Sequence, residues 1–280
     1  MRIGTLTIVG VGLIGGSIGL GARRRGLAGR VIGAGRHAAA LERARELGAI
    51  DHVCLDLCEA VRRADVAVFC TPVTLIPEQV LAVAPACANG TLLTDAGSTK
   101  GAIVRALDGK LPRGVPFVGS HPLAGSEKRG PEHADADLFQ GRVTVVTPTP
   151  RTDAAAVERT ADFWRGLDSR VIVMGPDEHD QALAMTSHLP HLLASALAGI
   201  LPPQLRPLAA TGFRDTTRVA AGDPSIWTGI FLQNRAALIE ALGQLQGRVI
   251  EFKQALMGGD EAAIDALLAE GKRSRDALGN

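Results

Sequence analysis

The residues best suited to acid–base chemistry lie in segment 119–130, which reads Gly-Ser-His-Pro-Leu-Ala-Gly-Ser-Glu-Lys-Arg-Gly. An imidazole accepts a proton near neutral pH, which makes His121 a candidate general base. Pro122 biases the backbone of His121 towards an extended conformation, and the apolar run 116–119 precedes it. We therefore expect His121 on a turn that leaves a strand at the carboxyl edge of a parallel sheet. A histidine of this kind can also merely cap a turn, so its role depends on the other segments.

Three further segments carry polar side chains that could face this histidine. Ser98 follows an apolar run and presents a hydroxyl on a turn. Ser187 and His191 lie four residues apart in a helical pattern, so they share one face of a regular helix. Arg218 follows in segment 212–220, where it can also merely pair with Asp215 three residues earlier. We expect these segments to converge with His121.

The histidines and cysteines do not predict a metal site. His188 and His191 are three residues apart, but no carboxylate or cysteine lies at companion spacing. The cysteines form no C-x-x-C unit, and we expect them to be the reduced thiols of a cytoplasmic protein. They are Cys54, Cys58, Cys70 and Cys87.

A glycine-rich turn near the N-terminus predicts a dinucleotide site. The apolar run 5–9 is followed directly by a G-x-G-x-x-G motif and then by a helical pattern, the context that gives this motif meaning. The first glycine allows the tight turn, the second lets the backbone approach a pyrophosphate, and the third lets helix and strand pack closely. The candidate residues of this turn are Gly10, Gly12, Leu13, Ile14 and Gly15.

The residues after the second predicted strand indicate which dinucleotide binds. An acidic residue there would accept hydrogen bonds from the ribose of NAD, but the sequence at 33–37 is Gly-Ala-Gly-Arg-His. The guanidinium of Arg36 can instead bind a 2′-phosphate. We therefore expect NADP to be favoured, with NAD possible. Thr71 and Pro72, which follow the apolar run 66–70, are further candidates for cofactor contact.

The arrangement of apolar runs predicts an α/β fold. Over the first 175 residues short strand patterns alternate with helical patterns, which indicates a parallel sheet covered on both faces. The expected strands are 5–9, 30–33, 66–70, 91–94, 117–119, 143–147 and 170–173. Beyond residue 176 the pattern is helical, with expected helices at 177–201, 225–257 and 260–278. We expect a Rossmann dinucleotide-binding domain at 1–175 and an all-helical substrate and dimerisation domain at 176–280.

Composition excludes several classes of partner. The 280 residues carry a net charge of +1, so no strong field would attract nucleic acid or a membrane surface. The N-terminus enters a strand pattern directly and lacks the plan of a signal peptide. The predicted helix at 225–257 is long for a globular domain, and its apolar residues recur at helical spacing. Such a helix usually packs against a partner, which predicts a homodimer formed through the helical domain.

Taken together, these segments resemble the prephenate and arogenate dehydrogenases of tyrosine biosynthesis. The segments that carry the resemblance are 10–17, 95–100, 121–130, 187–191, 215–220 and 223–227, in the order and spacing of that family. The resemblance implies a Rossmann domain and a helical dimerisation domain with the active site between them. It implies that His121 is the base, that Ser98 orients it, and that Arg218 holds the ring carboxylate. It also implies a substrate-binding role for His191, Ser187, Ser126 and Glu127.

The activity implied by this resemblance is an NAD(P)-dependent oxidative decarboxylation. The substrate would be prephenate, giving 4-hydroxyphenylpyruvate, or arogenate, giving tyrosine; the sequence leaves both open. One alternative is an NADP-linked reductase of a β-hydroxyacid or an imine, although such enzymes usually place a lysine or other acid on the first long helix of the second domain. Another is a dinucleotide-sensing module without catalysis, which would not need the set His121, Ser98 and Arg218.

Overall fold

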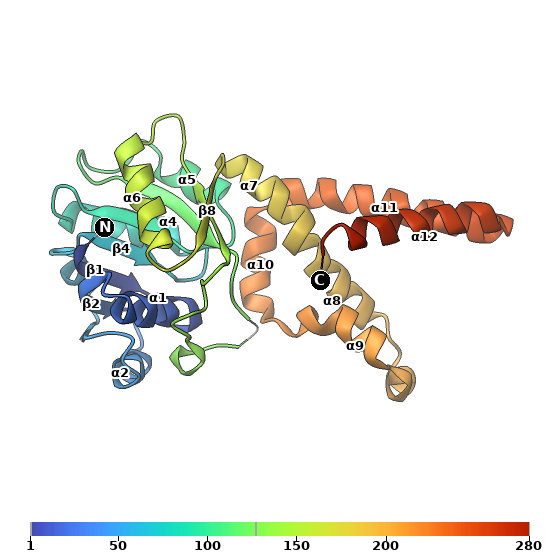
Figure 1. Ribbon diagram of the computed structural model, residues 1–280, viewed down its shortest axis with the longest axis horizontal. Coiled ribbons are helices and arrows are strands. Elements are labelled where there is room, and N and C mark those ends of the chain that lie inside the picture. The colour runs from blue at the N-terminus through green and yellow to red at the C-terminus, as the bar shows by residue number, and fades with distance from the viewer. Residues whose placement is uncertain (1, 127, 280) are drawn as a thin grey trace. The chain divides into compact units, whose positions relative to one another are not determined.

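The computed structural model describes residues 2–126 and 128–279. By its internal contacts the chain divides into two compact units, Met1–Asn234 and Arg235–Asn280. The first unit holds the sheet, its covering helices and the helices as far as α10 (Figure 1).

The sheet of the first unit has eight strands in the order β3-β2-β1-β4-β5-β6-β7-β8. The strands are β1 (Ile3–Val9), β2 (Ala28–Ala34), β3 (His52–Cys54), β4 (Val66–Phe69), β5 (Leu92–Asp95), β6 (Phe117–Pro122), β7 (Val143–Thr147) and β8 (Arg170–Val173). The sequence patterns predicted every strand except β3, which is a three-residue edge strand too short to show a period.

One pairing departs from the expected parallel sheet. β7 runs antiparallel to β6, with His121 opposite Val145, whereas the other pairings are parallel. The expectation of a wholly parallel sheet was therefore wrong at this position. The physical reason lies in the connection 123–142, whose described residues form one short 3₁₀ turn and no crossover helix. Without a crossover, the chain re-enters the sheet from the edge at which β6 left it.

Helices cover both faces of the sheet because successive strand residues point to opposite sides. In β1, Leu6 and Ile8 join one apolar cluster while Val9 joins the other. The first cluster is covered by α1 (Leu13–Arg24), α2 (Ala38–Glu46) and α6 (Ala154–Arg165). The second is covered by α3 (Leu57–Val61), α4 (Ile76–Val83) and α5 (Gly101–Leu107). Short 3₁₀ turns lie at Ala84–Ala86, Pro131–His133, Pro203–Leu208 and Arg218–Ala221.

The helical half begins with three segments that run on from one another. They are α7 (Pro176–Leu183), a π-helical turn η3 (Ala184–His188) and α8 (Leu189–Gly199). The predicted helix at 177–201 is therefore not regular in its middle. Pro190 has no amide proton to donate four residues back, and this interruption explains why the ladder widens just before it.

The predicted single helix at 225–257 is wrong. The structure has two helices, α10 (Pro224–Gln233) and α11 (Arg235–Gly258), separated by Asn234. The Asn234 amide group donates 2.7 Å to the carbonyl of Asp180 and lies 3.0 Å from Nδ1 of His188. These long-range bonds hold Asn234 outside the helical conformation, and periodicity cannot reveal them. A short helix, α9 (Thr211–Thr217), precedes α10 and was not predicted.

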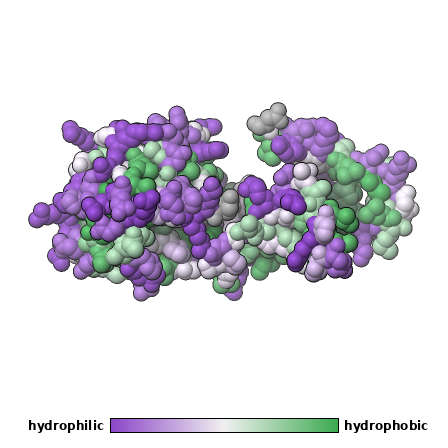
Figure 2. All heavy atoms as spheres, turned by 90° about the horizontal axis from the view of Figure 1, so that it is seen from below, coloured by the Kyte–Doolittle hydropathy of each residue, from purple (hydrophilic) through white to green (hydrophobic). Residues whose placement is uncertain are grey.

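The second unit consists of α11 and α12 (Glu261–Asp276), which run alongside one another (Figure 1). An ion pair of 2.7 Å between Arg248 and Glu270 joins them. Both carry exposed apolar side chains: Ile239, Val249, Ile250, Leu256, Met257 and Leu268. On the face drawn in Figure 2, hydrophobic residues gather over the helices that follow residue 176, whereas the part that contains the sheet is mostly hydrophilic. None of the described helices is both long and apolar enough to span a membrane.

Candidate active site

A cavity of about 1070 Å³ lies at the edge of the sheet where β5 and β6 end. The connection 123–142 forms one side, and the π-helical turn, α8 and α10 form the other. The cavity brings together Ser98, His121, Ser126, Ser187, His191 and Arg218. The structure therefore collects in one cavity the candidate catalytic and substrate-binding residues that it describes; Glu127 lies outside the described residues.

His121 is a residue of strand β6 and not of a turn, so the expectation of a turn was wrong. The difference arises because β7 pairs with the last residues of β6 and extends the strand through Pro122. The residue is 8% exposed, and Nδ1 of its ring lies 2.9 Å from Nε2 of His179. Backbone pairing on one side and this ring contact on the other fix His121 at the cavity wall.

On the side of His121 away from the cavity, the buried residues His179 and Asp180 extend this contact. Nδ1 of His179 lies 2.8 Å from Oδ1 of Asp180. The carboxylate of Asp180 also accepts the amide protons of Lys100 at 2.8 Å and Gly101 at 2.9 Å. Burial raises the pKa of Asp180, but these bonds from His179, Lys100 and Gly101 outweigh it, and the net pKa is below its ordinary value. Asp180 is therefore a carboxylate.

A second buried pair holds the strand that carries His121. Lys100 and Asp95, both wholly inaccessible, form an ion pair. The ammonium of Lys100 also donates 2.9 Å to the carbonyl of Ser120, while Asp95 accepts the amide proton of Ser120 at 3.1 Å. Burial lowers the pKa of Lys100, and Asp95 opposes that shift. Both the amide and the carbonyl group of Ser120, the residue before His121, are thus held by buried side chains.

The electrostatic surroundings keep His121 neutral. Burial lowers its pKa well below the ordinary value, and the neighbouring His179, Lys100 and His188 lower it further. A neutral imidazole offers one bare ring nitrogen, which is the state that a general base needs.

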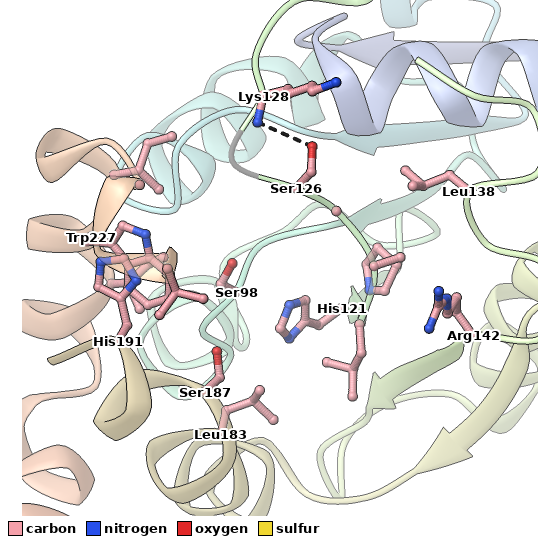
Figure 3. A pocket seen from close by; sticks show the side chains of 18 of the residues that line it. Ser98, His121, Ser126, Lys128, Leu138, Arg142, Leu183, Ser187, His191 and Trp227 are labelled. Carbon is pink, nitrogen blue, oxygen red and sulfur yellow. Dashed lines mark hydrogen bonds between the residues drawn. The ribbon is translucent and has the colours of Figure 1, made fainter. Parts of the chain in front are cut away.

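On the side of the cavity opposite His121, the ring of His191 lies against the ring of Trp227 (Figure 3). The rings of His191 and Trp227 are stacked, with centroids 3.5 Å apart and planes inclined by 13°. Nδ1 of His191 is buried and has no hydrogen-bond partner among the described residues. The hydroxyls of Ser98 and Ser187 also face this cavity. A buried nitrogen without a hydrogen bond raises the free energy of the folded protein, so this side of the cavity is suited to a polar ligand that bonds to it.

The mouth of the cavity carries charged groups. Arg218 begins the 3₁₀ turn before α10 and lines the cavity. Arg129 forms an ion pair with Asp223, which caps the start of α10. The Ser126 hydroxyl accepts the amide proton of Lys128 at 3.2 Å (Figure 3). The mouth is therefore polar and carries charges of both signs.

The glycine-rich turn has the geometry of a dinucleotide cradle. Gly10 has φ of +90°, and a side-chain carbon there would meet Thr71 at 2.9 Å. A side-chain carbon at Gly15 would lie 2.2 Å from the carbonyl oxygen of Gly10, so this glycine allows α1 to pack on β1. At Gly12 nothing lies within 4 Å of that position, which leaves the turn open to a ligand. Among the described residues, no side chain caps the first amides of α1. The turn fits a pyrophosphate.

The other cofactor candidates surround this turn. Leu13 and Ile14 open α1, and Thr71 and Pro72 follow β4, which is the neighbour of β1 in the sheet. Arg36 is exposed two residues after the end of β2, with no carboxylate between Ala34 and His37. The structure thus brings the candidate cofactor residues to the ends of adjacent strands.

Sequence reasoning missed His179, Asp180 and the ring contact of Trp227. His179 and Asp180 follow Pro176-Asp-Glu in a charged stretch, and such a stretch resembles the solvent-exposed first turn of a helix. Burial there depends on α5 and β6, which are distant in sequence. The His179-Asp180 dipeptide at the start of the predicted helix 177–201 is the sequence signal that could have suggested this buried pair.

Comparison with known proteins shows the family of the chain. Residues 18–173 match the nucleotide-binding domain of prephenate dehydrogenase, and residues 175–270 match the dimerization domain of prephenate dehydrogenase. The chain belongs to the prephenate dehydrogenase family. The expected Rossmann fold followed by a helical domain is confirmed by these matches and by the solved structures of the family.

Several family members are similar along nearly their whole length. The cyclohexadienyl dehydrogenase of Zymomonas mobilis is 36% identical over 245 residues, covering 85% of this chain and 83% of that protein. Prephenate dehydrogenase from Aquifex aeolicus, solved in complex with hydroxyphenyl propionate and NAD+, superposes with a TM-score of 0.92 at 30% identity and 99% coverage of both chains. Arogenate dehydrogenase from Synechocystis gives a TM-score of 0.81 at 29% identity, with 98% of this chain and 99% of that chain covered.

Proposed function

We propose that this chain catalyses the NAD(P)-dependent oxidative decarboxylation of prephenate, arogenate or both. The observation that carries the proposal is a neutral, buried His121 at the wall of a cavity that also holds Ser98, His191 and Arg218. Its relatives named prephenate, cyclohexadienyl and arogenate dehydrogenases support the same reaction class.

The chemistry assigns a separate task to each residue. The bound nicotinamide ring supplies the hydride acceptor. His121 accepts the proton of the ring hydroxyl, a contribution of about 10²–10⁴ in rate. Ser98 orients that hydroxyl and the imidazole, and Arg218 holds the ring carboxylate until it leaves as carbon dioxide. Because aromatisation of the ring drives the reaction, positioning and one proton transfer are the main demands on the protein.

The remaining residues orient the side chain of the substrate. Nδ1 of His191, unpartnered within the described part of the chain, is available to a keto or carboxylate oxygen there. Ser187 adds a hydroxyl on the same wall, and Ser126 lies at the mouth. We also propose a substrate-binding role for Glu127, on the strength of its place in the family motif.

We propose that NADP is preferred over NAD. The support is the exposed Arg36 and the absence of a carboxylate from residues 34–37, where NAD-specific sites place one. Arg36→Asp should weaken NADP binding by about 10-fold or more, because a charge-assisted bond to the 2′-phosphate is lost and repulsion replaces it. NAD binding should change far less. Fluorescence titration of both dinucleotides measures this, with Arg43→Asp on α2 as the control; equal losses for both would refute the assignment.

We also propose a homodimer formed through the helical domain, with domain limits of 1–175 and 176–280. The match to a dimerization domain and the exposed apolar residues of α11 and α12 support it. Light scattering should give twice the mass of one chain. Leu256→Glu should lower the measured mass, because it places a charge among the exposed apolar residues of α11.

The first experiment is an assay of reduced nicotinamide formation. Prephenate and arogenate are each supplied with NAD and with NADP to the purified protein. Turnover with at least one pair supports the proposed function. Absence of turnover with all four pairs, in protein shown to bind a dinucleotide, would refute it.

A further inference from the structure

Three side chains form a continuous hydrogen-bonded series that starts at the cavity wall. Nδ1 of His121 contacts Nε2 of His179 at 2.9 Å, and Nδ1 of His179 contacts Oδ1 of Asp180 at 2.8 Å. His121 lines the cavity, whereas His179 is 0% exposed and Asp180 is 6% exposed. The two inner residues can therefore act on the reaction only through His121.

The direction of each bond follows from the carboxylate. An ionised carboxylate can only accept, so Nδ1 of His179 carries the proton in the bond to Asp180. A neutral His179 then has a bare Nε2, which must accept from the neighbouring ring. His121 consequently carries its proton on Nδ1 and leaves Nε2 bare. The series thus selects the tautomer of His121 in which the ring nitrogen not used by His179 can accept a proton.

The surroundings keep Asp180 ionised and the two rings neutral. Asp180 is held by the amide protons of Lys100 and Gly101 in addition to His179. The other charged or titratable groups facing the series are Lys100, Asp95 and His188. Burial lowers the pKa of His179 despite its bond to Asp180, so this ring is neutral before reaction.

We propose that His179 and Asp180 are positioning residues that fix the tautomer of His121 and stabilise the charge that it gains during the reaction. This inference rests on the proposed function, in which His121 is the base. The substrate hydroxyl proton is transferred to Nε2 of His121, and the Nδ1 proton of His121 can move to Nε2 of His179. The positive charge then lies beside the Asp180 carboxylate, and no further reactant is needed for balance.

The tautomer can be tested without any substrate. Long-range ¹H–¹⁵N correlation spectra of histidine-labelled enzyme distinguish a protonated ring nitrogen from a bare one, and His121→Asn assigns the His121 signals. The expected result at pH 7.5 is a protonated Nδ1 and a bare Nε2 on His121. A protonated Nε2 on His121 would overturn the proposal. Because this readout needs no turnover, it stands even if the assay refutes the proposed function.

The effect on catalysis is tested with two substitutions of the middle residue. His179→Leu removes the acceptor, and kcat should fall about 10²–10⁴-fold, with KM and dinucleotide affinity within about threefold. His179→Gln can accept from His121 through its oxygen and donate to Asp180 through its amide group, so it should recover at least about 10-fold of that loss. Recovery by Gln is what a merely structural role would not produce.

The matched control is His52→Gln, since His52 is an exposed histidine on the edge strand β3 and lies outside this series. Its kcat should stay within about threefold of the parent enzyme. A folded His179→Leu enzyme with nearly normal kcat would overturn the proposal, as would a Gln variant no better than the Leu variant. If His179→Leu does not fold, the tautomer measurement on the unmodified enzyme decides.

Discussion

The two sides of the His121 ring differ in how their polar groups are satisfied. On the inner side, His179, Asp180, Lys100 and Asp95 are buried and bonded to one another or to backbone groups. On the cavity side, Nδ1 of His191 has no hydrogen-bond partner among the described residues, although it is buried.

This difference separates two tasks that a single histidine has to combine. The satisfied side resists rearrangement, since breaking any of its bonds leaves a buried polar group unpaired. The unsatisfied side reserves its hydrogen-bonding capacity for a ligand. The buried residues on the inner side thus fix the position of the His121 ring. The residues on the cavity side are left to bind a ligand.

The most severe way to break this arrangement is to remove the ring between the two sides. His121→Asn should lower kcat about 10²–10⁴-fold, because no group remains to accept the hydroxyl proton. Dinucleotide affinity should be unchanged, since the turn at 10–15 is built by other residues. Steady-state kinetics and dinucleotide titration measure both quantities, with His133→Asn as an exposed control. Turnover within about 10-fold of the parent enzyme would contradict the role of base.

A substitution at the mouth tests the cavity side alone. Arg218→Lys keeps the charge but loses bidentate binding of a carboxylate, so kcat/KM should fall about 10–100-fold, chiefly through KM. Arg214→Lys, one turn earlier on α9, is the control and should change little. An unchanged KM for prephenate and arogenate would show that Arg218 does not hold the carboxylate.

The hydroxyl of Ser98 should matter less than either charged group. Ser98→Ala removes one neutral hydrogen bond, worth about 0.5–1.5 kcal/mol, and kcat/KM should fall about 3–10-fold. Ser274→Ala on α12 is the matched control. A loss as large as that of His121→Asn would mean that Ser98 shares the proton transfer itself.

The smallest expected effect is that of pH between 8 and 6.5. A base must be neutral, and the pKa of His121 is lowered by burial first and by His179, Lys100 and His188 next. The ring therefore stays neutral as pH falls through 6.5, and kcat/KM should change by less than about twofold over this range. The acid limb should begin only at lower pH. A midpoint at or above 6.5 would mean that the ring is less buried than the structure has it.

The burial of a second histidine, His188, makes the free energy of unfolding depend on pH. Burial lowers the pKa of His188 to about 4, with Asp180 opposing and His179 and His191 adding to the shift. Since the unfolded chain binds a proton near pH 6.5 and the folded chain does not, stability is full above pH 6.5 and declines as pH falls towards 4.

How much of this could be predicted from the sequence depends on how local each feature is. The turn at 10–15 and the strands are encoded by neighbouring residues, and the sequence patterns predicted them. The position of His121 inside a strand depends on β7, and the break at Asn234 depends on bonds to Asp180 and His188. Burial of His179 likewise depends on segments far away in the chain. Features made by such distant contacts leave no periodic signal.

The π-helical turn at Ala184–His188 sets the rotational phase of α8 relative to α7. Each residue of an α-helix turns the chain by about 100°, since 3.6 residues complete one turn. Losing one residue within this turn would therefore rotate His191 by roughly a quarter of a circle, away from Trp227 and out of the cavity. Along this helix, the length of the chain is as much a determinant of the site as the identity of its side chains.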